Sequence, residues 1–79
     1  MEIKVLGTGC ARCRSLETAT RKAAEELQME AAIDKIEDIQ EIMAYGILRT
    51  PGLVINGKVV LSGRVPKVSE LIEIIQKNQ

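Results

Sequence analysis

Residues 7–13 of this chain read GTGCARC, and they contain both of its cysteines, Cys10 and Cys13. They follow an apolar run at residues 3–6 and precede a helical pattern that begins near Ala11. A helix that begins there directs its free N–H groups and positive dipole end at Cys10, which favours the thiolate. Three residues of helix separate the two Cα atoms by roughly 5 Å, which a disulfide tolerates. This spacing permits Cys10 to attack a disulfide and Cys13 to resolve the product.

The helical pattern continues over residues 11–28, with apolar side chains at spacings of three and four. Cys13 lies on this apolar stripe, so we expect it to be the more buried cysteine. Cys10 precedes the stripe and should be more exposed. Arg12 and Arg14 point elsewhere, and two interpretations stay open for them: a solvated helix face, or added positive potential on the Cys10 thiolate.

Two glycines separate the first strand from the cysteines. Gly7 and Gly9 break the strand pattern, and we expect both to give the backbone the freedom to place Cys10. Thr8 or Gly9 is the expected cap of the helix that follows.

Length and composition limit the possible function classes. The chain has 79 residues, and we expect one domain over residues 1–79. Lysine plus arginine and aspartate plus glutamate number 11 each, and Tyr45 is the only aromatic residue, so neither net charge nor base stacking favours nucleic acid. No apolar stretch approaches the ~20 residues of a membrane helix, so we expect no membrane partner. No long apolar stripe is left over, which favours a monomer.

The first residues, MEIK, show no charged-then-apolar pattern of a signal peptide, so we expect a cytoplasmic protein. In that reducing compartment a CxxC pair is typically catalytic or metal-binding rather than a structural staple.

The middle of the chain predicts an edge strand and a short helix. Residues 30–36 form a weakly alternating pattern with two charged residues, which suits an edge strand. Asp38 and Glu41 form a capping-box pattern, and Gly46 is a natural helix stop. The expected buried face of this helix consists of Ile39, Ile42 and Met43.

The end of the chain predicts a hairpin and a last helix. Residues 53–55 and 58–61 are strand candidates joined by Asn56-Gly57, a sequence typical of a type I′ turn. Pro66 fits the first turn of the final helix. An amphipathic stripe follows at Val68, Leu71, Ile72 and Ile75. The predicted class is α/β, with the order β-α-β-α-β-β-α and a four-stranded mixed sheet flanked by helices.

This order, with a CxxC at the first strand–helix junction and Thr50-Pro51 before the hairpin, resembles the thioredoxin-like fold. It is most similar to the small thioredoxin- or glutaredoxin-like redox-active disulfide proteins of archaea and bacteria. The resemblance implies a thiol-disulfide oxidoreductase that acts as a redox carrier, with no cofactor beyond a redox-active Cys10–Cys13 disulfide. It also implies protein disulfides as substrates and a disulfide reductase as partner.

The resemblance assigns roles to single residues. Cys10 is implied as the attacking thiolate, Cys13 as the resolving thiol, and Pro51 as a cis-proline that faces the disulfide. Thr50 is implied to offer backbone hydrogen bonds to an extended substrate segment. The supporting residues around the cysteines are Gly9, Ala11 and Arg12.

Three departures from thioredoxins stand out. Gly9 replaces the aromatic residue before the first cysteine, and Arg12 replaces the proline before the second. Six residues before Cys10, where thioredoxins carry a buried carboxylic acid, this chain has Lys4. The proton acceptor of the second cysteine is therefore left open between a lysine, water and Glu2.

The main alternative is a carrier of a soft metal such as Cu(I), held by the same two cysteines. Residues 7–13 loosely resemble the GMTCxxC loop of heavy-metal-associated domains, but Thr8 stands where their methionine would be. Those domains also end in a strand, whereas this chain is predicted to end in a helix. Structural zinc needs four ligands, and the chain has no histidine and no third cysteine, so we predict no metal site. In a further alternative the cysteines only pack.

Overall fold

The structure is a computed structural model that describes residues 1–79. Four strands and three helices follow one another in the predicted order. Their bounds are β1 (Glu2–Leu6), α1 (Ala11–Glu26), β2 (Ala32–Ile36), α2 (Ile39–Ala44), β3 (Gly52–Ile55), β4 (Lys58–Ser62) and α3 (Val68–Lys77).

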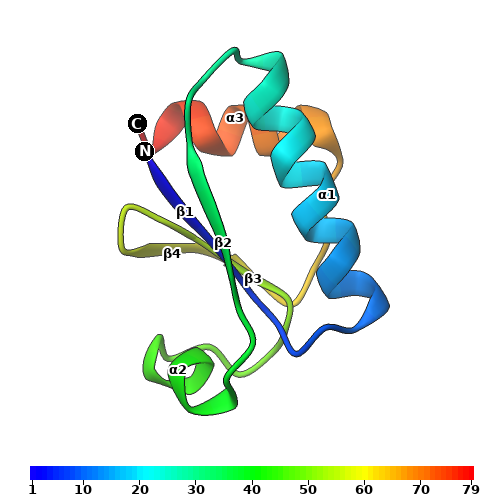
Figure 1. Ribbon diagram of the computed structural model, residues 1–79, viewed down its shortest axis with the longest axis vertical. Helices are drawn as coiled ribbons and strands as arrows, with labels where there is room; N and C mark the ends of the chain where they lie inside the picture. Colours follow the sequence, from blue (N-terminus) through cyan, green and yellow to red (C-terminus); the bar gives the residue numbers. More distant parts are fainter.

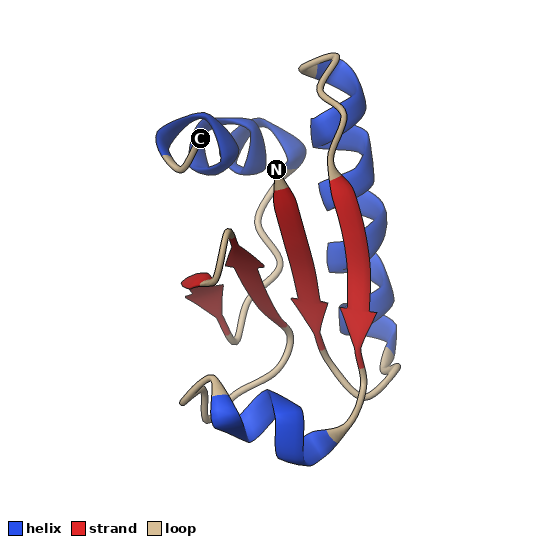
Figure 2. Ribbon diagram, turned by 60° about the vertical axis from the view of Figure 1, so that its left-hand side comes forward, coloured by secondary structure: helices blue, strands red, loops and turns tan.

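The four strands form one mixed sheet in the order β2-β1-β3-β4, which confirms the predicted sheet type and places β2 at an edge. β1 and β2 are parallel, whereas β3 is antiparallel to both of its neighbours. Leu6 pairs with Ile36 on one side and with Gly52 on the other. Three chain segments therefore meet at the same end of the sheet: the ends of β1 and β2 and the start of β3. The arrowheads of β1 and β2 lie together at this end in Figure 2.

The two faces of the sheet bury separate apolar clusters, because side chains alternate along each strand. α1 and α3 cover one face, and α2 lies apart from both of them (Figure 1). The larger cluster consists of Ile3, Val5, Leu16, Ala23, Leu53, Ile55, Leu61, Leu71 and Ile75. The smaller cluster, against α2, consists of Leu6, Ile42, Ile47 and Val54.

The predicted buried face of α2 is wrong. Ile42 is buried, but Ile39 and Met43 are 60% and 65% exposed. The helix has only six residues, so a single side chain reaches the sheet. Asp38 does cap it, with its Oδ1 accepting from the N–H of Gln40 at 2.8 Å, although no reciprocal bond from Glu41 forms.

Local signals in the second half of the chain gave mixed results. Asn56 and Gly57 both have positive φ, 49° and 84°, as a type I′ turn requires. Gly46 has φ 81° directly after α2, which confirms it as the helix stop. Pro66, however, lies before α3 rather than in its first turn, because Lys67 is the N-cap residue.

No helix has the length and apolar character that crossing a membrane demands.

Candidate functional site

Cys10 itself caps α1, in place of the predicted Thr8 or Gly9. Its backbone is extended, with φ −69° and ψ 167°, and its Sγ accepts a hydrogen bond from the N–H of Cys13 at 3.2 Å. Its carbonyl oxygen accepts the first helical hydrogen bond, from the N–H of Arg14 at 3.0 Å. The sulfur thus takes the place of an N-cap oxygen and occupies one of the free N–H groups of the helix end. A negative charge on this sulfur is stabilised by that hydrogen bond and by the helix dipole.

Cys10 and Cys13 form a disulfide, with their Cα atoms 5.1 Å apart. Cys13 is 5% exposed and belongs to the buried stripe of α1, whereas Cys10 is exposed. Both burial predictions are confirmed. A molecule that approaches from solvent therefore meets the sulfur of Cys10 first.

Cys13 lies so close to the backbone of Gly7 that no side chain fits at this position. A Cβ built on Gly7 would lie 2.7 Å from the Cβ of Cys13, and it would also collide with the Cys13 Sγ. The backbone freedom expected of both glycines is used only at Gly9, which has φ +88°; Gly7 has no positive φ. The absence of a side chain at Gly7 lets the buried sulfur pack directly against the end of β1.

Arg12 and Arg14 both hydrogen-bond to backbone carbonyl oxygens. The guanidinium of Arg14 donates to the carbonyl of Gly9 at 2.6 Å, which ties the first turn of α1 to the loop before it. The guanidinium of Arg12 donates to the carbonyl of Gly63 at 3.0 Å. Both side chains are exposed, so the solvated interpretation holds in part, but each also holds a segment of the site in place.

The Thr50–Pro51 peptide bond is cis, the geometry that the resemblance implies for this position. Because Leu6 pairs with Gly52, Pro51 lies beside the loop that carries the cysteines. The carbonyl of Pro51 accepts a hydrogen bond from the N–H of Gly63 at 2.8 Å, and Gly63 in turn receives Arg12. A continuous chain of two hydrogen bonds therefore connects α1 to the cis-proline. Pro51 is buried and Thr50 is half-buried.

Lys4, which the count from Cys10 suggested as a proton acceptor, lies on the face of the sheet opposite Cys13. Its Nζ donates to the hydroxyl of Tyr45 at 3.4 Å and lies 3.7 Å from a carboxylate oxygen of Glu2. The hydrogen bond to Tyr45 raises the pKa of Lys4, with the charge of Glu2 as a further cause, so its ammonium stays protonated. Glu2 alternates with Ile3 and faces the same side as Lys4. Neither residue is placed to serve Cys13.

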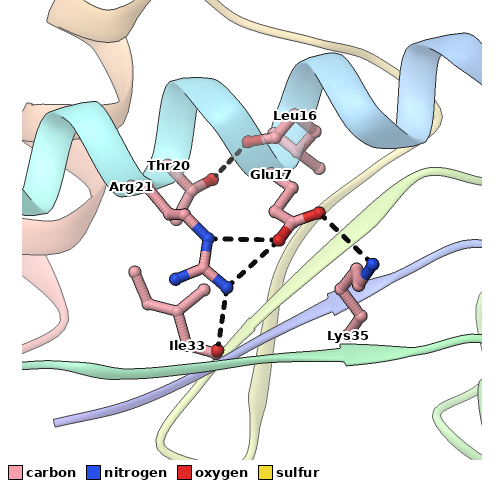
Figure 3. A network of polar contacts seen from close by, with 6 residues as sticks. All are labelled: Leu16, Glu17, Thr20, Arg21, Ile33 and Lys35. Carbon is pink, nitrogen blue, oxygen red and sulfur yellow. Dashed lines mark hydrogen bonds and ion pairs between the residues drawn. The ribbon is translucent and has the colours of Figure 1, made fainter.

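A cavity of about 150 Å³ lies beside Cys13. Its lining consists of Val5, Gly7, Gly9, Cys13, Arg14, Glu17, Lys35 and Glu37. Figure 3 shows Glu17 held between two cations, with Arg21 at 3.1 Å and Lys35 at 4.0 Å. The charged groups at this site thus come from α1 and from the end of β2.

The structure gathers the predicted site residues at one edge of the sheet. Gly9 to Cys13 form the end of the loop and the start of α1, and the register places Thr50 and Pro51 beside them. Sequence reasoning missed Glu37 and Gly63. A signal existed for Glu37: it directly follows β2, which a helix connects to β1. Strands connected by a helix are typically parallel, and the carboxyl ends of parallel strands meet at one end of the sheet.

The sequence comparison identifies the family. Residues 1–76 match the family model described as thioredoxin domain. The chain belongs to this family. It is 37% identical over 75 residues to a thioredoxin of Methanothermobacter thermautotrophicus, which covers 95% of this chain and 97% of that relative. It is also 37% identical over 71 residues to a thioredoxin of Methanocaldococcus jannaschii, covering 90% of this chain and 81% of that relative.

The fold has a counterpart among solved structures. A structure described as that of a malarial protein superposes on this member of the thioredoxin-domain family with a TM-score of 0.69. The match covers 98% of this chain and 94% of the other at 14% sequence identity, so it supports the fold alone. The disulfide, the fold and the family together identify a thiol-disulfide oxidoreductase.

The competing metal-carrier interpretation gains no support from the site. The chain ends in α3 after a hairpin, whereas the metal carriers considered above end in a strand.

Proposed function

We propose that this protein reduces disulfides of protein substrates, with Cys10 as the attacking thiolate and Cys13 as the resolving thiol. The observation that carries this assignment is the asymmetry of the pair. Cys10 is exposed and its sulfur receives an N–H of the helix terminus, whereas Cys13 is 5% exposed behind it. An attacking sulfur must be reachable and ionised; Cys10 is the reachable cysteine, and the N–H at its sulfur favours the thiolate.

The reaction proceeds in two exchanges. The Cys10 thiolate attacks one sulfur of the substrate disulfide, so that a Cys10–substrate bond forms and the other substrate sulfur leaves as a thiolate. The thiol of Cys13 then loses its proton and attacks Cys10, which releases the second substrate thiolate and closes the Cys10–Cys13 disulfide. Two electrons pass from the protein to the substrate, and a disulfide reductase must return them.

The loop around the cis-proline is the proposed contact for the substrate chain. Thr50 and Pro51 lie beside the cysteine loop at the start of β3. Thr50 is half-buried, and its backbone would pair with an extended segment of substrate next to Cys10. Gly9 and Ala11 leave little side-chain bulk around that sulfur.

We further propose that the protein acts as a monomer in the cytoplasm, where a reducing environment keeps it supplied with electrons. Light scattering of the reduced protein at micromolar concentration tests the monomer, and a mass of twice 8.7 kDa would contradict it.

Single cysteine variants test the assignment of roles. Cys10→Ser should abolish reduction of a protein disulfide. Cys13→Ser should accumulate a mixed disulfide with substrate at Cys10, detectable by mass spectrometry after acid quenching. Thr18→Ser, on the exposed side of the same helix, is the matched control and should behave like the wild type. If the Cys13→Ser variant turned over freely without a trapped intermediate, Cys13 would not be the resolving thiol.

A further inference from the structure

The resolving thiol needs a proton acceptor that β1 does not supply. Cys13 is almost fully buried, and loss of hydration disfavours the charge of its thiolate. The residues of β1 and its end that line the cavity beside Cys13 are Val5 and Gly7, and neither can take a proton. Lys4 and Glu2 lie on the opposite face of the sheet. The acceptor must therefore come from another wall of the cavity or from solvent.

Three of the four charged residues that line this cavity already have partners. Arg14 donates to the carbonyl of Gly9, and as a guanidinium it is a permanent cation. Glu17 forms ion pairs with Arg21 and with Lys35, which engages Lys35 as well (Figure 3). Arg14 and Lys35 are cations and cannot accept a proton, and the carboxylate of Glu17 is already engaged by Arg21 and Lys35.

Glu37 is the exception. Its carboxylate makes no hydrogen bond and no ion pair, although it lines the same cavity as Cys13. It directly follows Ile36, whose carbonyl accepts a hydrogen bond from the N–H of Gly7 at 3.0 Å. The pairing of β2 with β1 thus places Glu37 near the end of β1. The sulfur of Cys13 packs against this same end of β1.

Gly9 leaves room for this carboxylate. A Cβ built on Gly9 would lie 3.2 Å from the Oε2 of Glu37, closer than most side chains come to one another. The glycine that replaces an aromatic residue of thioredoxins therefore lets Glu37 reach the cysteine loop. The cavity of about 150 Å³ exceeds the ~30 Å³ that one water occupies in the liquid, and four charged side chains line it as hydrogen-bond partners for water.

We propose that Glu37 is the proton acceptor of Cys13 in the resolution step, acting across the cavity through water. The inference rests on the proposed function. As Cys13 attacks the Cys10–substrate disulfide, its S–H proton passes to a cavity water, and that water gives a proton to the Glu37 carboxylate. The Cys13–Cys10 bond forms, the Cys10–substrate bond breaks, and the substrate leaves as a thiolate. Glu37 returns its proton to solvent, because its side chain is exposed.

Single-turnover kinetics with a neutral reagent, 4,4′-dithiodipyridine, separate the two steps. The reduced protein should release one thiopyridine as Cys10 attacks, at a rate proportional to reagent concentration. It should release a second as Cys13 resolves, at a rate independent of that concentration. In the wild type the rate of the second phase should not change with pH in the range where carboxylates are ionised and thiols are protonated.

The variant Glu37→Gln should slow the second phase at least tenfold at pH 7, since a positioned general base contributes roughly 10²–10⁴-fold. Its second rate should rise about tenfold per pH unit, because Cys13 must then ionise beforehand, while its first phase stays unchanged. Glu25→Gln, an exposed residue late in α1, makes the same charge change away from the cavity and should leave both phases unchanged.

The sign of the effect separates a proton acceptor from a bystander charge. A carboxylate that acted only through its charge would oppose a thiolate nearby, so its removal would accelerate the second phase. A second phase of Glu37→Gln that is unchanged or faster, with a normal first phase, overturns the proposal. So does a wild-type second rate that rises tenfold per pH unit from pH 5 upward. A wild type without any concentration-dependent first phase would instead contradict the proposed function.

Discussion

The N–H of Cys13 lies 3.2 Å from the sulfur of Cys10 and donates a hydrogen bond to it, so one cysteine of the pair stabilises charge on the other. This contact exists because Cys10 occupies the N-cap position of α1 and Cys13 the third helical position. Helix geometry places the N–H of the third helical position within reach of the N-cap side chain. The two sulfurs are therefore unequal before any substrate arrives.

This inequality predicts selective alkylation. In the reduced protein Cys10 should react with iodoacetamide much faster than Cys13, because Cys10 is exposed and the N–H of Cys13 and the positive end of the helix dipole favour a negative charge on its sulfur. The measurement is the pH dependence of alkylation, with peptide mapping to identify the modified cysteine. Two cysteines that titrate together near the ordinary value of about 8.5 would contradict the role of the helix end.

Gly7→Ala should destabilise the protein by about 1–3 kcal/mol, the usual cost of forcing an extra methyl into a packed region. The new Cβ would collide with Cys13, which is fixed on a buried helix stripe. Urea unfolding of the oxidised protein measures the change. Thr8→Ala is the matched control, since Thr8 is the exposed neighbour in the same loop, and it should alter stability by less than about 0.5 kcal/mol. Equal stabilities of the two variants would show that Cys13 moves aside.

Arg12→Ala should weaken the connection between α1 and the cis-proline loop. The lost hydrogen bond to the carbonyl of Gly63 is exposed, so we expect about 0.5–1 kcal/mol of lost stability. The amide of Gly63, which donates to Pro51, should exchange faster with solvent deuterium. Lys22→Ala removes an unpaired cation from the exposed face of the same helix and should change neither quantity. Unaltered exchange at Gly63 in Arg12→Ala would mean that the loop holds its shape without the arginine.

The ion pair between Arg64 and Glu70 should make stability depend on pH. The hydrogen bond from Arg64 lowers the pKa of Glu70 from its usual 4.5. A depressed pKa in the folded state adds stability above the unfolded value, and this contribution disappears as the pH falls through the folded value. Glu70→Gln should therefore be less stable than the wild type at pH 7. This difference in the free energy of unfolding should disappear in strong acid.

Urea unfolding at pH 7 and at pH 2.5, in low salt, tests this expectation. Glu73→Gln, on the same helix and without a cationic partner, should have nearly the wild-type free energy of unfolding at both pH values. If Glu70→Gln lost the same free energy of unfolding at both pH values, the side chain of Glu70 would contribute through packing rather than charge.

Periodic and local signals in the sequence predicted most of the fold. The apolar run of β1, the stripe of α1 and the Asn56-Gly57 turn each depend on neighbours in the chain, and each appears in the structure. The same locality explains the correct burial order of Cys10 and Cys13. The predictions for Pro66 and for the buried face of α2 were wrong because the position of a short segment depends on what it packs against.

The sequence by itself determined the element order, the position of the cysteine pair at the start of a helix and the inequality between its two sulfurs, because all three depend on contacts within a few residues. Tertiary structure alone decided which distant groups surround that pair. The parallel register of β1 and β2 places Glu37 beside Cys13, and the turn after β4 brings Gly63 between Arg12 and Pro51. Strand register is set by the packing of the whole sheet, so the residue six positions before Cys10, Lys4, has its side chain on the face opposite Cys13.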